Sequence, residues 1–229
     1  MRRILIGVVL TALFSVGAVT AGAVTTTPTN AKTRGVVLLV GDSNINVGAE
    51  AIERTLTQPD NGYVPIFAAR NGAKIRTPDC PDELTCTTFD YWKTKLAGLT
   101  SKIKADVIVN DLGINDTIVP GTETTPGYLF YGRKIDWFMN LVGGKPVLWT
   151  TLPCAIEPSS RQTGCKTVNF ELYRALDRWP NLTVLAWAAE ADQHPTYLPP
   201  TGDVHYTPAG QWAWARFVQA ALDARLAAP

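Results

Sequence analysis

The chain has 229 residues, of which 46% are hydrophobic and 18% are charged, and its formal net charge is +1. This composition is typical of a globular protein and excludes an intrinsically disordered one. Because no block of like charges occurs, the sequence argues against nucleic acid or a polyanionic surface as the main partner. The length, less an export segment, suits one domain of roughly 200 residues.

The N-terminus has the pattern of a secretory signal peptide. Two arginines precede an apolar run at residues 4–19, and a small-residue cleavage site follows at 21–23. We therefore predict a signal peptide at residues 1–23, a disordered leader at 24–34, and a secreted or cell-envelope location. An uncleaved membrane anchor is the alternative, although the run is short for a span of about 20 residues. A twin-arginine export signal at Arg2-Arg3 is a weaker alternative, because the rest of that motif is missing.

The predicted domain, residues 35–229, opens with the stretch GVVLLVGDSNINVG. Its apolar run at 36–40 is short, β-branched and bounded by glycines, which predicts a buried strand. Ser43 follows that strand, and the pattern becomes helical after Gly48. Ser43 should thus lie at the carboxyl edge of a sheet, where open α/β sheets bind their ligands. Ser43 is either a helix N-cap or a nucleophile, and this stretch alone favours the N-cap.

Apolar, β-rich runs alternate with segments of helical spacing in the rest of the chain. Strands are predicted at residues 36–40, 63–68, 106–109, 146–150 and 182–187, and helices at 49–56, 89–103, 128–142, 168–178 and 208–226. Trp149 and Trp187 fall in two of these strands. Strands that alternate with helices indicate right-handed crossovers and a parallel sheet covered on both faces. We therefore predict an α/β fold, a three-layer α/β/α sandwich around a five-stranded parallel sheet.

Long connections follow four of the predicted strands, and loops of such length in a compact domain are usually functional. They span residues 70–86, 113–125, 152–165 and 188–206. All four should emerge at the same edge of the sheet as Ser43, since the strands are parallel.

Two of these loops contain the four cysteines of the chain, Cys80, Cys86, Cys154 and Cys165. An even number in an exported chain indicates disulfides, and four cysteines allow three pairings. We favour the local pairs Cys80–Cys86 and Cys154–Cys165, which would stiffen the rim of a site. Zinc is a poor alternative, because the sequence has no C-x-x-C motif and only two histidines.

A nucleophilic serine needs a base, and the base needs a group that orients it. His205 lies between the last predicted strand and the last helix, where Thr207 has the position of an N-cap, so it should reach the edge that carries Ser43. Asp203, two residues earlier, would point to the same side of an extended segment and could accept from the imidazole. The other histidine, His194, lies in a polar loop and is expected to be exposed.

An ester-cleaving site also needs preorganised donors for an oxyanion. The Ser43 N–H is one candidate, and Gly72 after the second strand is another, since glycine lets the backbone approach a ligand closely. The side-chain amide of Asn115, after the third strand, is the third candidate. Each has an ordinary explanation as a turn residue. Their joint occurrence at strand ends, with a serine and a histidine, favours catalysis.

These motifs resemble those of the SGNH hydrolases, the GDSL esterase/lipase superfamily. Gly41-Asp42-Ser43 matches the nucleophile block, Gly72 the glycine of the second block, Gly113-x-Asn115-Asp116 the third block and His205 the fifth. The resemblance extends from residue 35 to the C-terminus. It implies a flavodoxin-like sheet of order 2-1-3-4-5 and an acyl-serine intermediate formed without metal or other cofactor.

The sequence departs from this family's pattern before the histidine. The family has its acid three residues ahead, as D-x-x-H, and that position is Gly202 here. Either Asp203 orients His205 as D-x-H, which we favour, or a carbonyl does so and the site is a Ser–His dyad. Asp192 is a distant third choice.

Three functions are compatible with these residues. The first is an exported serine esterase that acts on short-chain acyl or O-acetyl carbohydrate esters. The second is a cell-envelope acyltransferase that passes the same acyl group to a glycan. The third is a noncatalytic glycan-binding module, suggested by the seven tryptophans. We expect a monomer whose partner is a small-molecule or glycan ester, with a membrane contact only through an uncleaved anchor.

Overall fold

The computed structural model describes most of the chain from residue 33 onward. The described ranges are 33–75, 104–117, 127–155, 159–200 and 203–227. The predicted signal peptide, most of the predicted leader, the predicted helix 89–103 and the predicted pair Cys80–Cys86 lie outside them. Arg34, the last residue of the predicted leader, is held by an ion pair of 2.6 Å with Asp223 and by its N–H bond to the Gly62 carbonyl.

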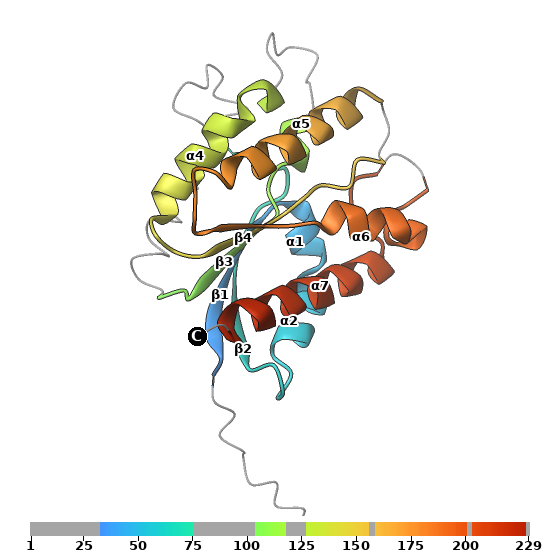
Figure 1. The fold of residues 1–229 in the computed structure, drawn as a ribbon. Coiled ribbons are helices and arrows are strands. Elements are labelled where there is room, and N and C mark those ends of the chain that lie inside the picture. Colours follow the sequence, from blue (N-terminus) through green and yellow to red (C-terminus); the bar gives the residue numbers. More distant parts are fainter. Residues whose placement is uncertain (1–32, 76–103, 118–126, 156–158, 201–202, 228–229) are drawn as a thin grey trace, which may run out of the picture. The chain divides into compact units, whose positions relative to one another are not determined.

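A five-stranded parallel sheet forms the centre of the fold, with the strand order β2-β1-β3-β4-β5 (Figure 1). Its strands are β1 (Gly35–Gly41), β2 (Tyr63–Ala69), β3 (Val107–Asn110), β4 (Val147–Thr150) and β5 (Leu182–Leu185). This confirms the predicted α/β fold and the predicted strand order.

Helices cover both faces of the sheet, as the three-layer prediction requires (Figure 1). The α-helices are α1 (Ser43–Val47), α2 (Ala49–Leu56), α4 (Tyr131–Val142), α5 (Ser159–Ala175), α6 (Trp187–Gln193) and α7 (Pro208–Ala227). Short 3-10 helices are η1 (Ile114–Thr117), η2 (Gly127–Phe130) and η3 (Pro195–Tyr197). Helices α4 and α5 pack on one face, and α2, α6 and α7 pack on the other.

The central strand β1 shows why the sheet is buried on both sides. Leu38 and Val40 point into the core under α4 and α5, whereas Val37 and Leu39 point into the core under α2 and α7. Successive side chains of a strand face opposite ways, so an uninterrupted apolar run fills both cores.

Two predicted boundaries at the far edge of the sheet are wrong. The last strand ends at Leu185, and Trp187 begins helix α6 instead of extending the strand. The pairing of β4 with β5 stops at Thr150–Leu185, and the Thr151 hydroxyl accepts the Ala188 N–H at 2.9 Å, which turns the chain into α6. The predicted loop 188–206 therefore contains α6 except for its first residue, and all of η3.

Helix α5 also differs from its prediction, because it begins at Ser159 instead of residue 168. The sequence predicts a loop for most of its first half, because Ser, Thr and Gly are frequent there and carry little helical periodicity. Tertiary contacts hold the middle of the helix directly after this half: Asn169 accepts the Leu152 N–H and donates to the Leu152 carbonyl, each at 2.8 Å.

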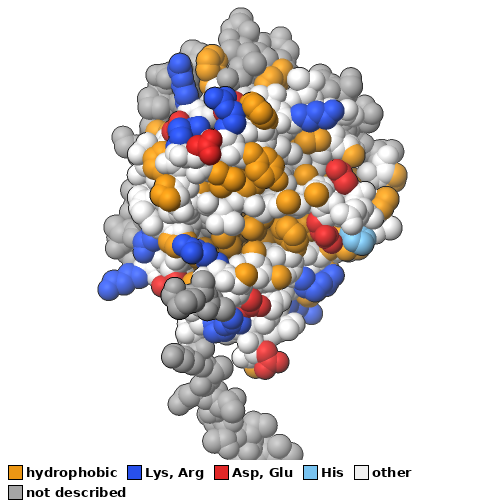
Figure 2. Space-filling model, in the orientation of Figure 1, with side chains coloured by type: hydrophobic (Ala, Val, Ile, Leu, Met, Phe, Trp, Pro, Cys, Tyr) orange, Lys and Arg blue, Asp and Glu red, His pale blue; other side chains and the backbone are white. Residues whose placement is uncertain are grey.

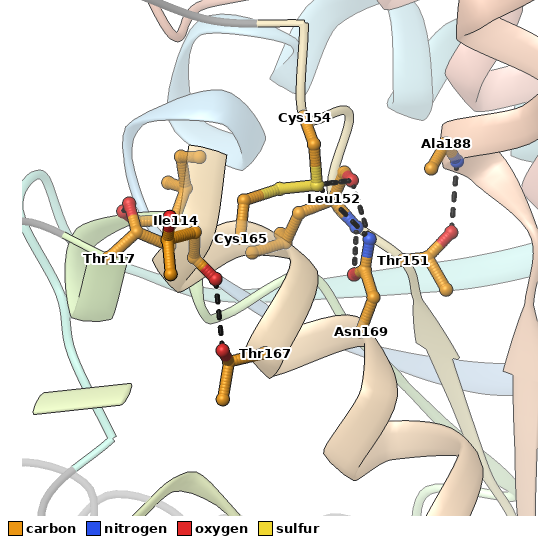
Figure 3. The surroundings of a disulfide bond; sticks show 10 residues. Ile114, Thr117, Thr151, Leu152, Cys154, Cys165, Thr167, Asn169 and Ala188 are labelled. Atoms are coloured by element: carbon orange, nitrogen blue, oxygen red, sulfur yellow. Dashed lines mark hydrogen bonds between the residues drawn. A yellow bond between two sulfur atoms is a disulfide. The ribbon is translucent and has the colours of Figure 1, made fainter. Parts of the chain in front are cut away.

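The disulfide Cys154–Cys165 confirms one of the two predicted local pairs, with the two Cα atoms 5.5 Å apart. Figure 3 shows that it joins the segment after β4 to helix α5, beside Asn169. Because the bond crosses from a loop to a helix, it fixes the first turns of α5 against the edge of the sheet.

We expect the loss of this disulfide to destabilise the fold. Replacing both Cys154 and Cys165 by serine should lower the free energy of unfolding by about 2–3 kcal/mol, since the closed loop restricts the unfolded chain. Urea unfolding of the double variant measures this, with Thr167→Ala on the exposed side of the same helix as a control. An unchanged unfolding midpoint would show that the bond is dispensable.

On the face shown in Figure 2, basic and acidic side chains are interspersed among the coloured residues. This agrees with the absence of charge blocks in the sequence. Within the described ranges, no helix is long and apolar enough to span a membrane.

Candidate active site

A cleft of about 480 Å³ lies at the carboxyl edge of the sheet. Its described lining residues come from the ends of β1, β2 and β3, from the start of α5 and from the segment before α7; they are Ser43, Asn71, Gly72, Asn115, Arg161, Asp203, Val204 and His205. The cleft thus contains all five residues for which a role in chemistry was predicted.

Ser43 is the first residue of α1, and it is not the N-cap. The cap is Asp42, whose carboxylate accepts the Asn44 N–H at 3.0 Å. The turn is tight, since a Cβ on Gly41 would lie 2.1 Å from a side-chain carbon of Ile45. With the capping done by Asp42, the Ser43 hydroxyl is free for another partner.

That partner is His205. The Ser43 Oγ lies 2.9 Å from Nε2 of the imidazole, and the Asp203 carboxylate lies 2.6 Å from Nδ1. If Nδ1 carries the proton toward Asp203, Nε2 is left as an acceptor for the hydroxyl proton. Hydrogen bonds from His205, first from its backbone N–H and also from its ring, keep the pKa of Asp203 below its ordinary value, so this carboxyl is ionised.

Asp203 reaches His205 at the D-x-H spacing because one carboxyl oxygen makes two contacts with the histidine. Its Oδ1 accepts the backbone N–H of His205 at 3.1 Å as well as the ring contact. The following helix is capped by Thr207, whose hydroxyl accepts the Gly210 N–H at 3.1 Å, as predicted. The imidazole is therefore fixed from both sides along the chain.

Asn44 positions the histidine segment and was not found from the sequence. Its side chain donates to the Val204 carbonyl at 3.2 Å and accepts the Tyr206 N–H at 3.3 Å, so it bonds to both neighbours of His205. A buried amide needs such partners. The available signal was an asparagine directly after the serine.

The second histidine of the chain lies outside the cleft. His194 is at the end of α6, 3.4 Å from Glu190 and stacked on Tyr197, with its side chain 47% exposed. Neither His194 nor Asp192 lines the cleft.

Two of the three predicted oxyanion donors are unoccupied. Among the described residues, neither the Ser43 N–H nor the Gly72 N–H donates a hydrogen bond to another protein group. Gly72 has φ of +70°, a conformation that glycine adopts without strain. Its loop is held by the Arg70 N–H on the Gly41 carbonyl, 3.2 Å, and by Asn46 on Asn71, 2.7 Å.

The third predicted donor, Asn115, is already engaged. Its Nδ2 donates to Asp42 at 3.0 Å and to the Ala73 carbonyl at 3.2 Å. An oxyanion would have to replace one of these acceptors. The Ala73 bond is the longer of the two.

Three buried carboxyls lie beneath the site. Asp116 accepts from Lys134 at 2.5 Å and from the Ile75 N–H at 3.3 Å. Burial, with the nearby Asp111 and Asp116 charges, raises the pKa of Asp42 to about 8. Burial raises the pKa of Asp111 to about 7, although the Thr150 hydroxyl donates to it. No group of three His, Cys, Asp or Glu side chains in the described ranges is arranged to hold a metal ion.

These raised pKa values predict that stability falls as the pH rises. Between the ordinary carboxyl pKa of 3.8 and the folded values of about 8 and about 7, the folded protein holds protons that the unfolded chain has lost. Stability should thus decrease from about pH 5 to about pH 8, by up to about 1.4 kcal/mol per pH unit for each carboxyl.

Thermal unfolding across this range measures the effect. Asp111→Asn should flatten the profile, whereas Asp60→Asn, at an exposed position, should leave it unchanged. A wild-type profile that rises over this interval would contradict the account.

The similarity of this chain to known proteins is found in its structure and not in its sequence. No protein-family model matches the sequence, and no curated protein is significantly similar to it. Three solved structures illustrate the likeness. The lipase/acylhydrolase from Enterococcus faecalis has a TM-score of 0.64 and 16% identity, over 83% of this chain and 96% of that one.

The second is the catalytic domain of the peptidoglycan O-acetyltransferase A from Streptococcus pneumoniae, with a TM-score of 0.61, 16% identity, and 85% and 96% of the two chains covered. The third is the Clostridium thermocellum family 3 carbohydrate esterase, with a TM-score of 0.58, 13% identity, and 84% and 98% covered. The chain thus has the SGNH hydrolase fold over most of its length.

Proposed function

We propose that this protein is an exported serine esterase that cleaves carboxylic esters through an acyl-serine intermediate. The observation that carries the proposal is the row of contacts from Ser43 through His205 to Asp203, at 2.9 and 2.6 Å, in an open cleft. The export signal in the sequence supports the location.

The contacts around Ser43 support each step of the proposed acyl transfer. The imidazole of His205 takes the hydroxyl proton as Ser43 Oγ bonds to the ester carbonyl carbon. Ser43 and Gly72 line the same cleft, and their N–H groups are available to hold the resulting oxyanion, with Asn115 as a further donor once it leaves Ala73. His205 then returns the proton to the leaving alcohol, and water, deprotonated by the same imidazole, releases the acid.

A small recess supports a short acyl group. It has about 10 Å³ of space, room for a group the size of one water molecule. It shares Val204 with the cleft, and its mainly apolar lining is Asn44, Ile114, Leu152, Pro153, Leu198, Val204 and Tyr206. The structurally similar carbohydrate esterase makes an O-acetylated carbohydrate a reasonable substrate class.

Transfer of the acyl group to a glycan is the second candidate, favoured by the likeness to an O-acetyltransferase domain. Incubation with an acetyl donor and a glycan acceptor separates the two. An esterase releases free acetate at a rate independent of the acceptor, whereas a transferase forms acetylated glycan.

The test of the proposal uses the purified wild-type protein with 4-nitrophenyl esters from acetyl to palmitoyl. We expect turnover to be fastest with acetyl and to fall as the chain lengthens. A fluorophosphonate probe should lose fluoride and add its phosphonyl group to the Ser43 oxygen, as seen by peptide mass spectrometry. A protein that neither turns over any ester nor reacts with the probe would instead be a noncatalytic binding module.

A further inference from the structure

The cleft has one strongly basic side chain among its described lining residues, that of Arg161. Arg161 has no role in the proposed acyl transfer, because proton transfer uses His205 and the oxyanion donors are amides. An arginine that lines a cleft beside the nucleophile therefore needs a separate explanation.

Contacts along the first half of α5 fix the position of Arg161. It lies in the first turn of α5, and Cys165 follows it one helical turn later, on the same side of the helix. The disulfide Cys154–Cys165 ties this turn to the segment after β4, and Asn169 ties the next turn to Leu152 (Figure 3). The start of α5 is thus fastened to the edge of the sheet on which Ser43 lies.

The guanidinium is half-buried without a fixed partner. No hydrogen bond or ion pair joins it to another residue in the described ranges, whereas Arg174 on the same helix pairs with Glu171 at 3.0 Å. Burial lowers the pKa of Arg161, and the nearby Asp203 charge acts in the opposite direction. Arg161 lines the cleft, and a guanidinium carries five N–H donors in a rigid fork that pairs with two oxygens of a carboxylate or a phosphate.

Pairing with Asp203 does not account for Arg161. The Asp203 carboxylate spends its Oδ1 on two bonds to His205, and no ion pair with Arg161 forms within 4 Å. The cleft therefore keeps a positive centre of its own beside the Asp203–His205 pair.

We propose that Arg161 is a specificity residue and that the substrate is an ester whose alcohol part bears an anionic group, a carboxylate or a phosphate. This inference rests on the proposed esterase function. The acyl part has its own small recess at Val204, which leaves the larger cleft, with Arg161, to the alcohol part.

Three acetyl esters with the same scissile bond test the inference: 4-acetoxybenzoate, 4-acetoxyphenyl phosphate and the neutral methyl 4-acetoxybenzoate. The measured quantity is kcat/KM for each charged ester relative to the neutral one. Arg161→Gln should lower this ratio by about 10- to 100-fold for the anion that the site binds, as loss of a charge-assisted contact does. Arg161→Lys should keep part of it.

Arg174→Gln, on the same helix and outside the cleft, is the matched control and should leave the ratio unchanged. The ratio cancels any effect of Arg161 on the chemistry itself or on folding. Added salt should reduce the wild-type preference for the charged ester. Which of the two anions loses more identifies the carboxylate or the phosphate as the recognised group.

A ratio that Arg161→Gln leaves unaltered for both anions would overturn the inference while leaving the esterase in place. No wild-type turnover of any of the three esters, with no fluorophosphonate labelling, would overturn the proposed function and the inference together.

Discussion

Ser43→Ala should lower kcat/KM for 4-nitrophenyl acetate by at least about 10³-fold. Among the described residues, the Ser43 hydroxyl is the nucleophile that contacts His205 Nε2, at 2.9 Å, and alanine leaves the amide donors in place. Residual turnover would come from the oxyanion donors and substrate binding alone. Steady-state kinetics measure the loss, and the fluorophosphonate probe should no longer add mass.

The matched control is Thr167→Ala, which removes an exposed hydroxyl that bonds only within α5. Far-UV circular dichroism and the thermal midpoint of both variants exclude unfolding as a cause. If Ser43→Ala keeps wild-type turnover, the hydroxyl is not the nucleophile and the proposed function is wrong.

Asp203→Asn should lower kcat by about 10²- to 10⁴-fold with a much smaller change in KM. The amide can place its NH₂ toward Nδ1, which forces the ring proton onto Nε2 and removes the acceptor for the Ser43 hydroxyl. The carboxylate also stabilises the imidazolium that forms during attack, and the amide does not. Because 55% of the Asp203 side chain is exposed, solvent screening favours the lower end of this range.

Asp192→Asn is the control for this variant, since Asp192 is the other acid considered from the sequence and lies outside the cleft. It should retain full activity. Near wild-type turnover in Asp203→Asn would instead identify the site as a Ser–His dyad, in which the backbone orients the ring.

The strands of the sheet could be predicted because the signal for each strand lies in its own residues. Four of the five strands begin and end within one residue of their predicted bounds, and α2 coincides with its prediction. Uninterrupted β-branched runs between turn residues have few alternatives to a strand that is buried on both faces. The prediction for Trp187 is wrong because a tryptophan at the start of a helix, buried against α7, has the same apolar signature as the end of a strand.

The early start of α5 was missed for the opposite reason. Residues 159–167 carry a weak helical signal, and the helix there depends on the disulfide at Cys165 and on the pairing of Asn169 with Leu152. Contacts between residues far apart in the chain override local propensity and leave no periodic trace in the sequence.

The sequence by itself determined the parallel sheet, the edge on which Ser43, Gly72, Asn115 and His205 meet, and the choice of Asp203 as the nearby acid. These follow from residue types at strand ends, because parallel strands all end at one edge. Only the tertiary structure decided that Asp42 caps α1, that Asn44 holds the His205 segment, that Asn115 is engaged by Asp42 and Ala73, and that Arg161 lies in the cleft. Each of these depends on side-chain directions and hydrogen-bond partners between distant segments, which are set by packing and not by spacing along the chain.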